Sequence, residues 1–383
     1  MNLSLRLRSS RYKLVCKMKG HHDAVTVLAI SEHGVLASGA LDGIRLWSLP
    51  EGTTIPIPHL GPATRGAISA LTWVTLGESD NDLLIFGTTS GFVGIWLRTD
   101  GRGAVDVVEE VVIMKIGQGE EITGLTTVKD ATGGCIVALC TLGGILQLWV
   151  VDAAAHMTSL FSKQLDIVPK TVSFSSTRDR LVVFGSRCGT VLTLDGVSGA
   201  LISRQTTRRA AIAGVAVDHS KDMFLMDNTW DGFDLFSMST CRWTRSFRTK
   251  DSPLQSSKQV TFAECGDVVV GGDDEGNFHV YTTAEGSLLD VLHQNRPGMI
   301  QTVTSHWTNG RSWIVVASSN VGRRSTICLW SHHGEAAAHI SSEPSTESPA
   351  VGDGILRWVM ILAAVAFVVQ NSSLVKSPSS ILL

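Results

Sequence analysis

The residues that could carry chemistry fall into three small polar groups. A catalytic centre needs a nucleophile with its base, a metal-ligand cluster or paired carboxylates. None of the patterns GxSxG, HExxH, GxxxxGK[ST] and GxGxxG occurs in the 383 residues. The groups that remain are His21–His22, the pair His332–His333 with His339, and the run Asp273–Asp274–Glu275.

A structural role is the better interpretation of each group. Neighbours on a strand point to opposite faces, so His21 and His22 do not converge on one metal ion. No cysteine or carboxylate stands at ligand spacing from His332–His333, which predicts a solvated linker. The run 273–275 precedes Gly276 and is typical of a hairpin turn, with a bound cation as the alternative. We therefore expect no catalytic residues, no cofactor and no metal.

The composition predicts a packed globular body in a reducing compartment. Hydrophobic residues make up 44% and charged residues 17%, which excludes a disordered chain. The net charge of −3 gives no indication of nucleic-acid binding. The seven cysteines are scattered and form no CxxC pair, so we expect no disulfides and a cytoplasmic location. Residues 1–11 are interpreted as a basic arm rather than as a transit peptide.

A short segment that runs from a turn into an apolar strand repeats seven times. The copies are DGIRLW (42–47), SGFVGIW (90–96), GGILQLW (143–149), CGTVLTL (188–194), DGFDLF (231–236), EGNFHVY (275–281) and RSTICLW (324–330). The large apolar residue that ends each copy recurs about every 47 residues. Two apolar runs precede each copy and a more polar run follows it. Each unit is therefore predicted to contain four short strands.

Four-stranded units of this kind bury their faces by stacking around a closed circle. The last unit ends near Gly334 without a good fourth strand, whereas residues 12–18 form a spare strand ahead of the first unit. We expect residues 12–18 to pair with residues 325–331 and close the ring. The predicted fold is all-β: a seven-bladed β-propeller of residues 12–334 closed by an N-terminal strand, with a C-terminal hydrophobic helix.

The repeats resemble those of the WD40 family, most closely in the first unit. Gly20-His21 precedes its first strand, and LASGALDGIRLW follows at 36–47. In that family a His, a Ser or Thr, an Asp and a Trp form a hydrogen-bonded brace inside a blade. The matching residues of this sequence are His21, Ser38, Asp42 and Trp47. The other units depart from the pattern, because their Asp column reads Ser90, Gly143, Cys188, Asp231, Glu275 and Arg324.

The resemblance implies that partner proteins dock on one face of the propeller. That face consists of the loops that enter the first strand of each blade and the loops between the second and third strands. Counted on these loops, eight basic residues stand against four acidic ones, which predicts a preference for acidic or phosphorylated segments. The expected partner-binding residues are Arg65, Arg187, Arg208, Arg209, Trp230, Asp274, Arg296 and Arg323. The alternative is a solvated rim whose charges only keep the protein soluble.

The predicted function is a non-catalytic protein–protein interaction scaffold. Two alternatives stay open because a fold does not fix a function. One is a substrate-recruiting adaptor of a ubiquitin-ligase or trafficking complex, a role that the resemblance implies. The other is an enzyme with its active site in the central channel, which would require ionisable side chains that converge near the axis.

The composition changes after Gly334. Residues 335–353 are rich in Ser, Glu, Pro, Ala and Gly and predict a flexible linker. Residues 354–383 are predicted to form a hydrophobic helix and a short polar tail. The apolar part, 355–369, would span roughly 22 Å, short of the roughly 30 Å hydrocarbon core of a bilayer. The alternatives are an anchor in an intracellular membrane and a helix that binds a partner or packs locally.

Overall fold

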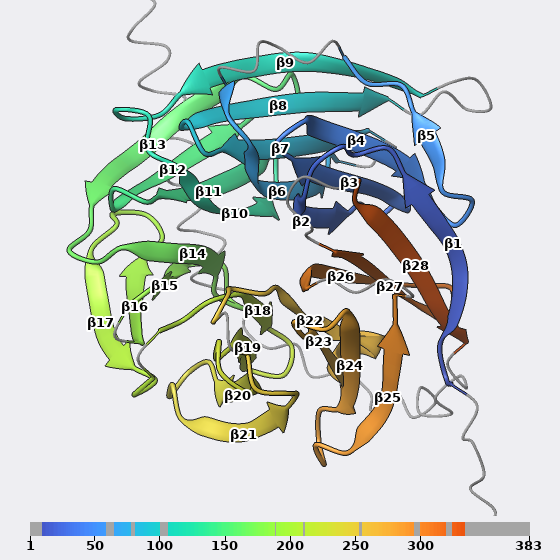
Figure 1. Ribbon diagram of the computed structural model, residues 1–383. Coiled ribbons are helices and arrows are strands. Elements are labelled where there is room, and N and C mark those ends of the chain that lie inside the picture. Colours follow the sequence, from blue (N-terminus) through green and yellow to red (C-terminus); the bar gives the residue numbers. More distant parts are fainter. Residues whose placement is uncertain are drawn as a thin grey trace, which may run out of the picture.

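Seven four-stranded antiparallel sheets form a closed ring (Figure 1). The computed structural model describes residues 10–58, 65–77, 81–99, 106–187, 189–209, 211–252, 255–294, 299–318 and 324–333. Its named elements are strands and one short 3-10 turn, η2 (Glu264–Gly266). The prediction of a seven-bladed all-β propeller is confirmed.

Each blade runs from an innermost strand at the channel to an outermost strand at the rim. Blades 1 and 2 consist of β2 (Val25–Ile30), β3 (Val35–Ala40), β4 (Gly43–Ser48), β5 (Thr53–Ile55), β6 (Ile68–Thr75), β7 (Asp82–Thr88), β8 (Phe92–Thr99) and β9 (Val107–Lys115). Blades 3 and 4 consist of β10 (Ile122–Lys129), β11 (Cys135–Thr141), β12 (Ile145–Val151), β13 (Met157–Gln164), β14 (Pro169–Phe174), β15 (Arg180–Gly185), β16 (Thr190–Asp195) and β17 (Leu201–Thr206). Blades 5 and 6 consist of β18 (Val215–Asp218), β19 (Met223–Asp227), β20 (Gly232–Ser237), β21 (Trp243–Arg248), β22 (Val260–Ala263), β23 (Val268–Gly272), β24 (Asn277–Thr282) and β25 (Leu288–His293). Blade 7 combines β26 (Ile300–Thr308), β27 (Arg311–Ser318) and β28 (Thr326–His333) with β1 (Lys13–Lys19).

The first strand of the chain completes the last blade. β1 pairs with β28 antiparallel, from Lys13 opposite Ser331 to Lys19 opposite Thr326. The two strands lie side by side at the right of Figure 1. Without β1, the outer edge of β28 would expose a row of unpaired backbone groups. The predicted closure of the ring by the N-terminal strand is therefore confirmed.

Glycine occupies the turn into the third strand of six blades, as the repeat predicted. At positions 43, 91, 144, 189, 232 and 276 the backbone has a positive φ, a region that other residues seldom adopt. At Gly91 a Cβ atom would lie 2.6 Å from the Cα of Gly119 in the loop that enters blade 3. The small residue therefore allows two neighbouring loops to meet.

Apolar side chains pack between neighbouring blades. Leu83 of blade 2 packs in one buried cluster with Val137 of blade 3, and the other described junctions have clusters of the same kind. Where blade 7 meets blade 1, Met18 of β1 shares a cluster with Trp47 and Val315. A fully buried side chain of this size contributes about 1.5–3 kcal/mol. The closing strand is thus held by burial as well as by backbone pairing.

A polar clasp fastens the start of β1 to blade 6. Tyr12 is 1% exposed, and its hydroxyl lies 2.5 Å from Oε1 of Glu264 in η2. Arg11 donates to the other oxygen of Glu264 at 2.7 Å, and its backbone N–H donates to Asp290 at 2.8 Å. Burial, followed by the contact with Glu264, raises the pKa of Tyr12, so the phenol keeps its proton and donates it to the carboxylate. These contacts hold β1 across the junction of blades 6 and 7.

The predicted C-terminal segments lie outside the described residues. This applies to the linker at 335–353 and to the hydrophobic helix at 354–383. Within the described ranges, no helix is both long and apolar enough to span a bilayer.

Candidate functional site: the loop face

Two sets of loops meet on one face of the ring, which we call the loop face. One set enters the first strand of each blade, and the other joins the second strand to the third. Backbone hydrogen bonds join the two sets: Thr89 N–H donates to Ala67 O at 2.9 Å, and Ser186 N–H to Val168 O at 2.8 Å. These contacts fix the two sets of loops against each other.

Blade 1 contains a buried chain of hydrogen bonds between its loops and its third strand. Trp47 Nε1–H donates to Ser38 Oγ at 2.9 Å, and His21 Nε2 lies 2.8 Å from the same oxygen. The other ring nitrogen of His21 lies 2.6 Å from Asp42 Oδ1, and Asp42 Oδ2 accepts the N–H of His22 at 2.9 Å. A neutral His21 with its proton on Nδ1 satisfies every group in this chain. The structure thus brings together the four residues that match the WD40 brace.

Burial keeps the imidazole of this brace neutral. His21 is 1% exposed, and desolvation lowers its pKa although the Asp42 carboxylate opposes the shift. Burial opposes ionisation of Asp42, but the His22 N–H and the His21 ring hold the pKa of Asp42 below its usual value. A fully satisfied network of this kind rigidifies its surroundings. The brace therefore positions the loops of blade 1.

A buried carboxylate of blade 5 links its loop to the loop that enters blade 6. In the strand register Met226 takes the place that Ser38 has in blade 1, and Asp227 is the next residue toward the loop face. Its carboxylate accepts the N–H groups of Lys258 and Thr229 at 2.8 and 3.0 Å. Burial raises the pKa of Asp227 to about 6. The repeat pattern gave no signal for this residue, because the position that matches Ser38 in the strand register is Met226.

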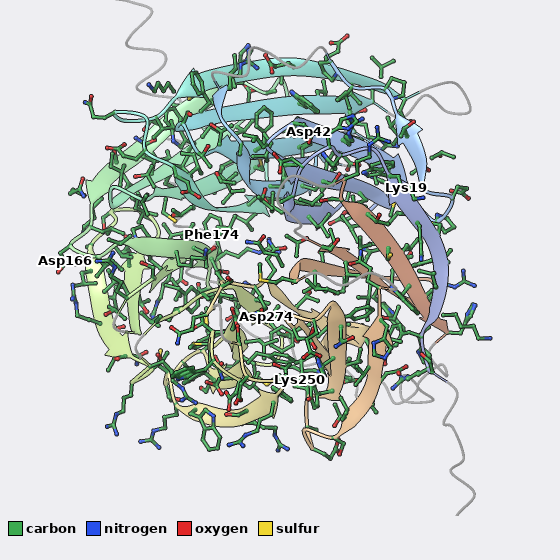
Figure 2. The ribbon with its side chains drawn as sticks, viewed as in Figure 1. Lys19, Asp42, Asp166, Phe174, Lys250 and Asp274 are labelled. Carbon is green, nitrogen blue, oxygen red and sulfur yellow. The ribbon has the colours of Figure 1, made fainter. Side chains whose placement is uncertain are left out.

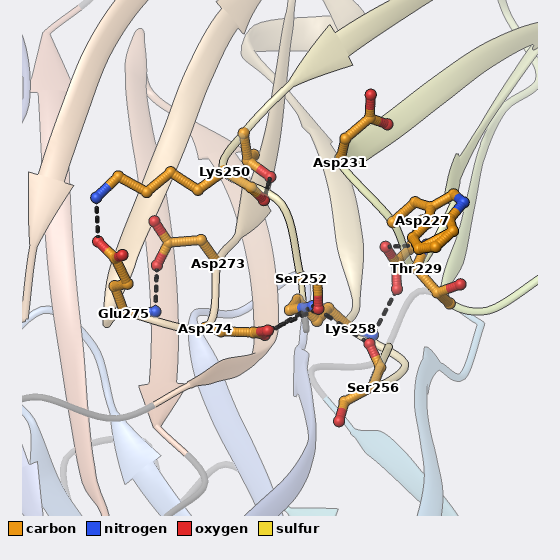
Figure 3. Close-up of polar contacts among 12 residues, drawn as sticks. Asp227, Thr229, Asp231, Lys250, Ser252, Ser256, Lys258, Asp273, Asp274 and Glu275 are labelled. Atoms are coloured by element: carbon orange, nitrogen blue, oxygen red, sulfur yellow. Dashed lines mark hydrogen bonds and ion pairs between the residues drawn. The ribbon is translucent and has the colours of Figure 1, made fainter. Parts of the chain in front are cut away.

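A buried lysine on the loop that enters blade 6 pairs with a carboxylate of the same blade (Figure 3). Lys258 Nζ lies 2.9 Å from Asp274 Oδ1 and 3.1 Å from Ser252 Oγ. The Ser252 hydroxyl donates to Asp274 Oδ2 at 2.6 Å. The side chain of Lys258 is 5% exposed and that of Asp274 is 11% exposed. The sequence predicted Asp274 as a partner-binding residue, but the structure places it in an internal ion pair because the loop that enters blade 6 lays Lys258 against it.

Two further predicted binding residues pair with carboxylates of their own blades. Arg65 lies 2.8 Å from Glu110 of β9. Arg209 lies 2.7 Å from Asp234 of β20, whose side chain is fully buried. Desolvation is the largest influence on Asp234 and raises its pKa. Both ion pairs reduce the positive charge that Arg65 and Arg209 present to a ligand.

Arg187 and Arg208 are exposed at the junction of blades 4 and 5. Trp230 is exposed at the junction of blades 5 and 6, where its carbonyl accepts the Ser252 N–H. Arg187 and Ala211 form a β-bridge, which sets the loop carrying Arg208 against the second-to-third-strand loop of blade 4. Trp230 is 63% exposed, and its N–H donates to Asn228 Oδ1 at 2.9 Å. Among the described residues, no carboxylate pairs with either arginine. The predicted binding residues Arg296 and Arg323 lie outside the described ranges.

The charge of the loop face is divided into sectors rather than uniformly positive. The turn between β23 and β24 brings the carboxylates of 273–275 to this face, two more than the sequence count included. Burial opposes ionisation of Asp273, yet hydrogen bonds led by His279 and Asn277 lower its pKa to about 2. Lys250 pairs with the last carboxylate of the run at 2.5 Å. Protein donors therefore hold this acidic run in a hairpin turn. Arg187 and Arg208, which have no carboxylate partner among the described residues, lie on other loops of this face.

The opposite face has a cavity of about 360 Å³ with several ionisable side chains. Its lining includes Asp218, His219, Glu264, Cys265 and His306. Asp218 accepts the N–H of Ser220 at 2.9 Å, and Glu264 is engaged by the clasp at Tyr12. In the part of the chain that the structure describes, no three His, Cys, Asp or Glu side chains group as metal ligands. The carboxylates of this cavity serve local structure.

Comparison with known proteins bears on the fold. No family profile matches this sequence, and no curated protein matches it. The crystal structure of the WD40 β-propeller domain of Doa1 is similar, with a TM-score of 0.60 at 17% sequence identity. The similarity covers 83% of this chain and 96% of that domain. With seven four-stranded blades closed by β1, the chain has the fold of a WD40-like seven-bladed β-propeller.

Proposed function

We propose that this protein is a non-catalytic scaffold that binds acidic segments of other proteins on its loop face. WD40-type propellers generally bind other proteins. The observation that carries the proposal is an exposed Trp230 on the same face as Arg187 and Arg208, neither of which has a carboxylate partner among the described residues.

This group combines the two side-chain types that contribute most at binding hot spots. A Trp side chain supplies a large apolar contact at a low cost in conformational entropy. Arginine donates charge-assisted, often bidentate hydrogen bonds to carboxylates or phosphates. Trp230 would therefore anchor an apolar residue of the partner, while Arg187 and Arg208 bind acidic groups that flank it.

The test compares matched variants in proximity labelling and pull-down with the full-length protein. The test variants are Trp230→Ala and the double variant Arg187→Glu with Arg208→Glu. The control variants are Trp243→Ala, at an exposed Trp of the outer strand β21, and Arg242→Glu, on the opposite face. We expect the test variants to lose partners that both controls retain. Equal partner sets for test and control variants would refute the proposal.

The cellular location stays a prediction. We propose a cytoplasmic propeller that residues 355–369 hold at an intracellular membrane, which would concentrate the loop face near membrane-bound partners. Cell fractionation of the full chain and of a chain without residues 354–383 tests this. A full-length chain that remains wholly in the soluble fraction would exclude the anchor.

A further inference from the structure

A second positive site lies at the seam where the ring closes. A cavity of about 470 Å³ opens there on the loop face. Lys19 at the end of β1 and Arg324 just before β28 line it from blade 7, and Arg45 of β4 lines it from blade 1. Figure 2 labels Lys19 and Asp42 on the two blades that meet here. The cavity therefore exists only in the closed ring.

The seam cavity has more positive charge than the protein neutralises. Lys19, Arg45 and Arg324 carry three positive charges, and two carboxylates belong to the adjoining segments, Asp42 beside Arg45 and Asp23 next to His22. Asp42 is already engaged by His21 and lies 3.8 Å from Arg45, too far for a hydrogen bond. The Arg45 side chain is 36% exposed, so its guanidinium remains accessible from the cavity.

The cavity is also built with little freedom of movement. Ser325 is buried and donates to the carbonyls of Asp23 and Ser318 at 2.7 and 3.1 Å, which fixes the backbone beside Arg324. A Cβ atom at Gly20 would lie 3.3 Å from Arg45 Nε and 3.1 Å from the Trp47 ring, so glycine leaves the space that the guanidinium uses. A fixed backbone at these positions reduces the ordering entropy that binding costs.

We propose that this seam pocket binds the phosphate group of a phosphorylated serine or threonine in a protein docked on the loop face. A phosphate monoester carries −1.5 to −2 charges near neutral pH and three acceptor oxygens. It therefore matches three cations better than a single carboxylate does. The inference rests on the proposed docking function of the loop face. For the same reason, the phosphate is assigned to a docked protein.

The direct test measures binding of acetyl-Gly-phosphoSer-Gly-amide and of its unphosphorylated form by ligand-observed NMR. We expect binding of the phosphorylated peptide only. The double variant Lys19→Gln with Arg324→Gln should weaken it by about tenfold or more, since it removes two charge-assisted contacts. Arg242→Gln, at an exposed arginine of the opposite face, should leave it unchanged. Equal binding of the two peptides, or an unaltered double variant, would overturn the inference.

Two further arms identify the source of the phosphate. Inorganic phosphate that binds as tightly as the peptide would indicate a free anion and overturn the assignment to a protein. The second probe is phosphatidylcholine vesicles with and without phosphatidylinositol 4-phosphate. Binding of the protein that requires this lipid, and that is lost in the Lys19/Arg324 double variant, would indicate a lipid and would also overturn the assignment to a protein.

Failure of this inference is distinguishable from failure of the proposed function. The partner proteins are treated with phosphatase before the pull-down with the full-length protein. Loss of partners after phosphatase and in the Lys19/Arg324 variant supports the seam pocket. Partners that resist both treatments, yet are lost with Trp230→Ala, overturn the seam pocket and leave the docking function in place.

Discussion

Replacing Ser38 by alanine tests whether the brace of blade 1 holds the loop face together. The Ser38 hydroxyl is fully buried and lies between Trp47 Nε1 and His21 Nε2, at 2.9 and 2.8 Å. Ser38→Ala removes one oxygen and leaves both ring nitrogens without a partner. Because Trp47 and His21 are themselves buried, water cannot readily replace the lost hydroxyl.

The expected cost follows from the number of orphaned groups. A buried polar group without its partner costs about 1–3 kcal/mol. Two such groups predict a loss of about 2–6 kcal/mol in the free energy of unfolding, a large part of the roughly 5–15 kcal/mol that folded proteins typically have.

The assay is urea unfolding followed by tryptophan fluorescence, with Ser312→Ala as the matched control. Ser312 is also fully buried, and its hydroxyl lies 3.3 Å from the Tyr12 hydroxyl. Tyr12 keeps its contact with Glu264 when Ser312 is truncated, so no group is orphaned and the loss should stay below about 1 kcal/mol. A Ser38→Ala protein as stable as the Ser312→Ala protein would refute the reasoning. The double variant with Trp47→Phe should show a coupling energy of about 1 kcal/mol or more.

Two predictions concern the buried network of blades 5 and 6. Lys258→Met leaves the Asp274 carboxylate buried without its cation and should cost about 3–5 kcal/mol in urea unfolding; adding Asp274→Asn should recover part of the loss, and no recovery would mean that the ion pair is not the cause. Burial raises the pKa of Asp227 from 3.8 to about 6, so the folded state binds its proton more tightly than the unfolded state does. This contribution to stability is present below pH 4 and is lost as the pH rises through 6. The stability of Asp227→Asn relative to the wild type should therefore rise between pH 4 and 7 by up to about 3 kcal/mol, and a difference that does not change with pH would contradict the assignment.

The repeat made the fold predictable from the sequence because its signals are local. Gly43 and its counterparts mark turns that need a positive φ, and the apolar run at 135–140 becomes β11, which is buried along its whole length. The ring closure was predictable because the last unit lacked a strand and the segment at 12–18 could supply one. Each of these signals is contained within one stretch of the chain.

The surface chemistry was harder to predict because it depends on contacts between separate loops. Arg209 and Lys258 counted as free charges in the sequence, yet each pairs with a carboxylate of its own blade. The seam cavity combines Lys19, Arg45 and Arg324, which are far apart in the sequence and meet only when the ring closes. The signal that could have found it is Arg324, a cation in a column where the family has Asp.

The pairing of β1 with β28 has a consequence for the order of events during synthesis. At about 5–20 residues per second, the ribosome needs roughly 15–60 s to add the ~300 residues between the two strands. Throughout that time β1 has finished translation but lacks its partner, with its backbone groups free to pair wrongly. Lys13, Lys17 and Lys19 are exposed on this short strand, and such charges discourage pairing with other nascent chains. The lysines thereby disfavour wrong pairing of β1 until β28 has been synthesised.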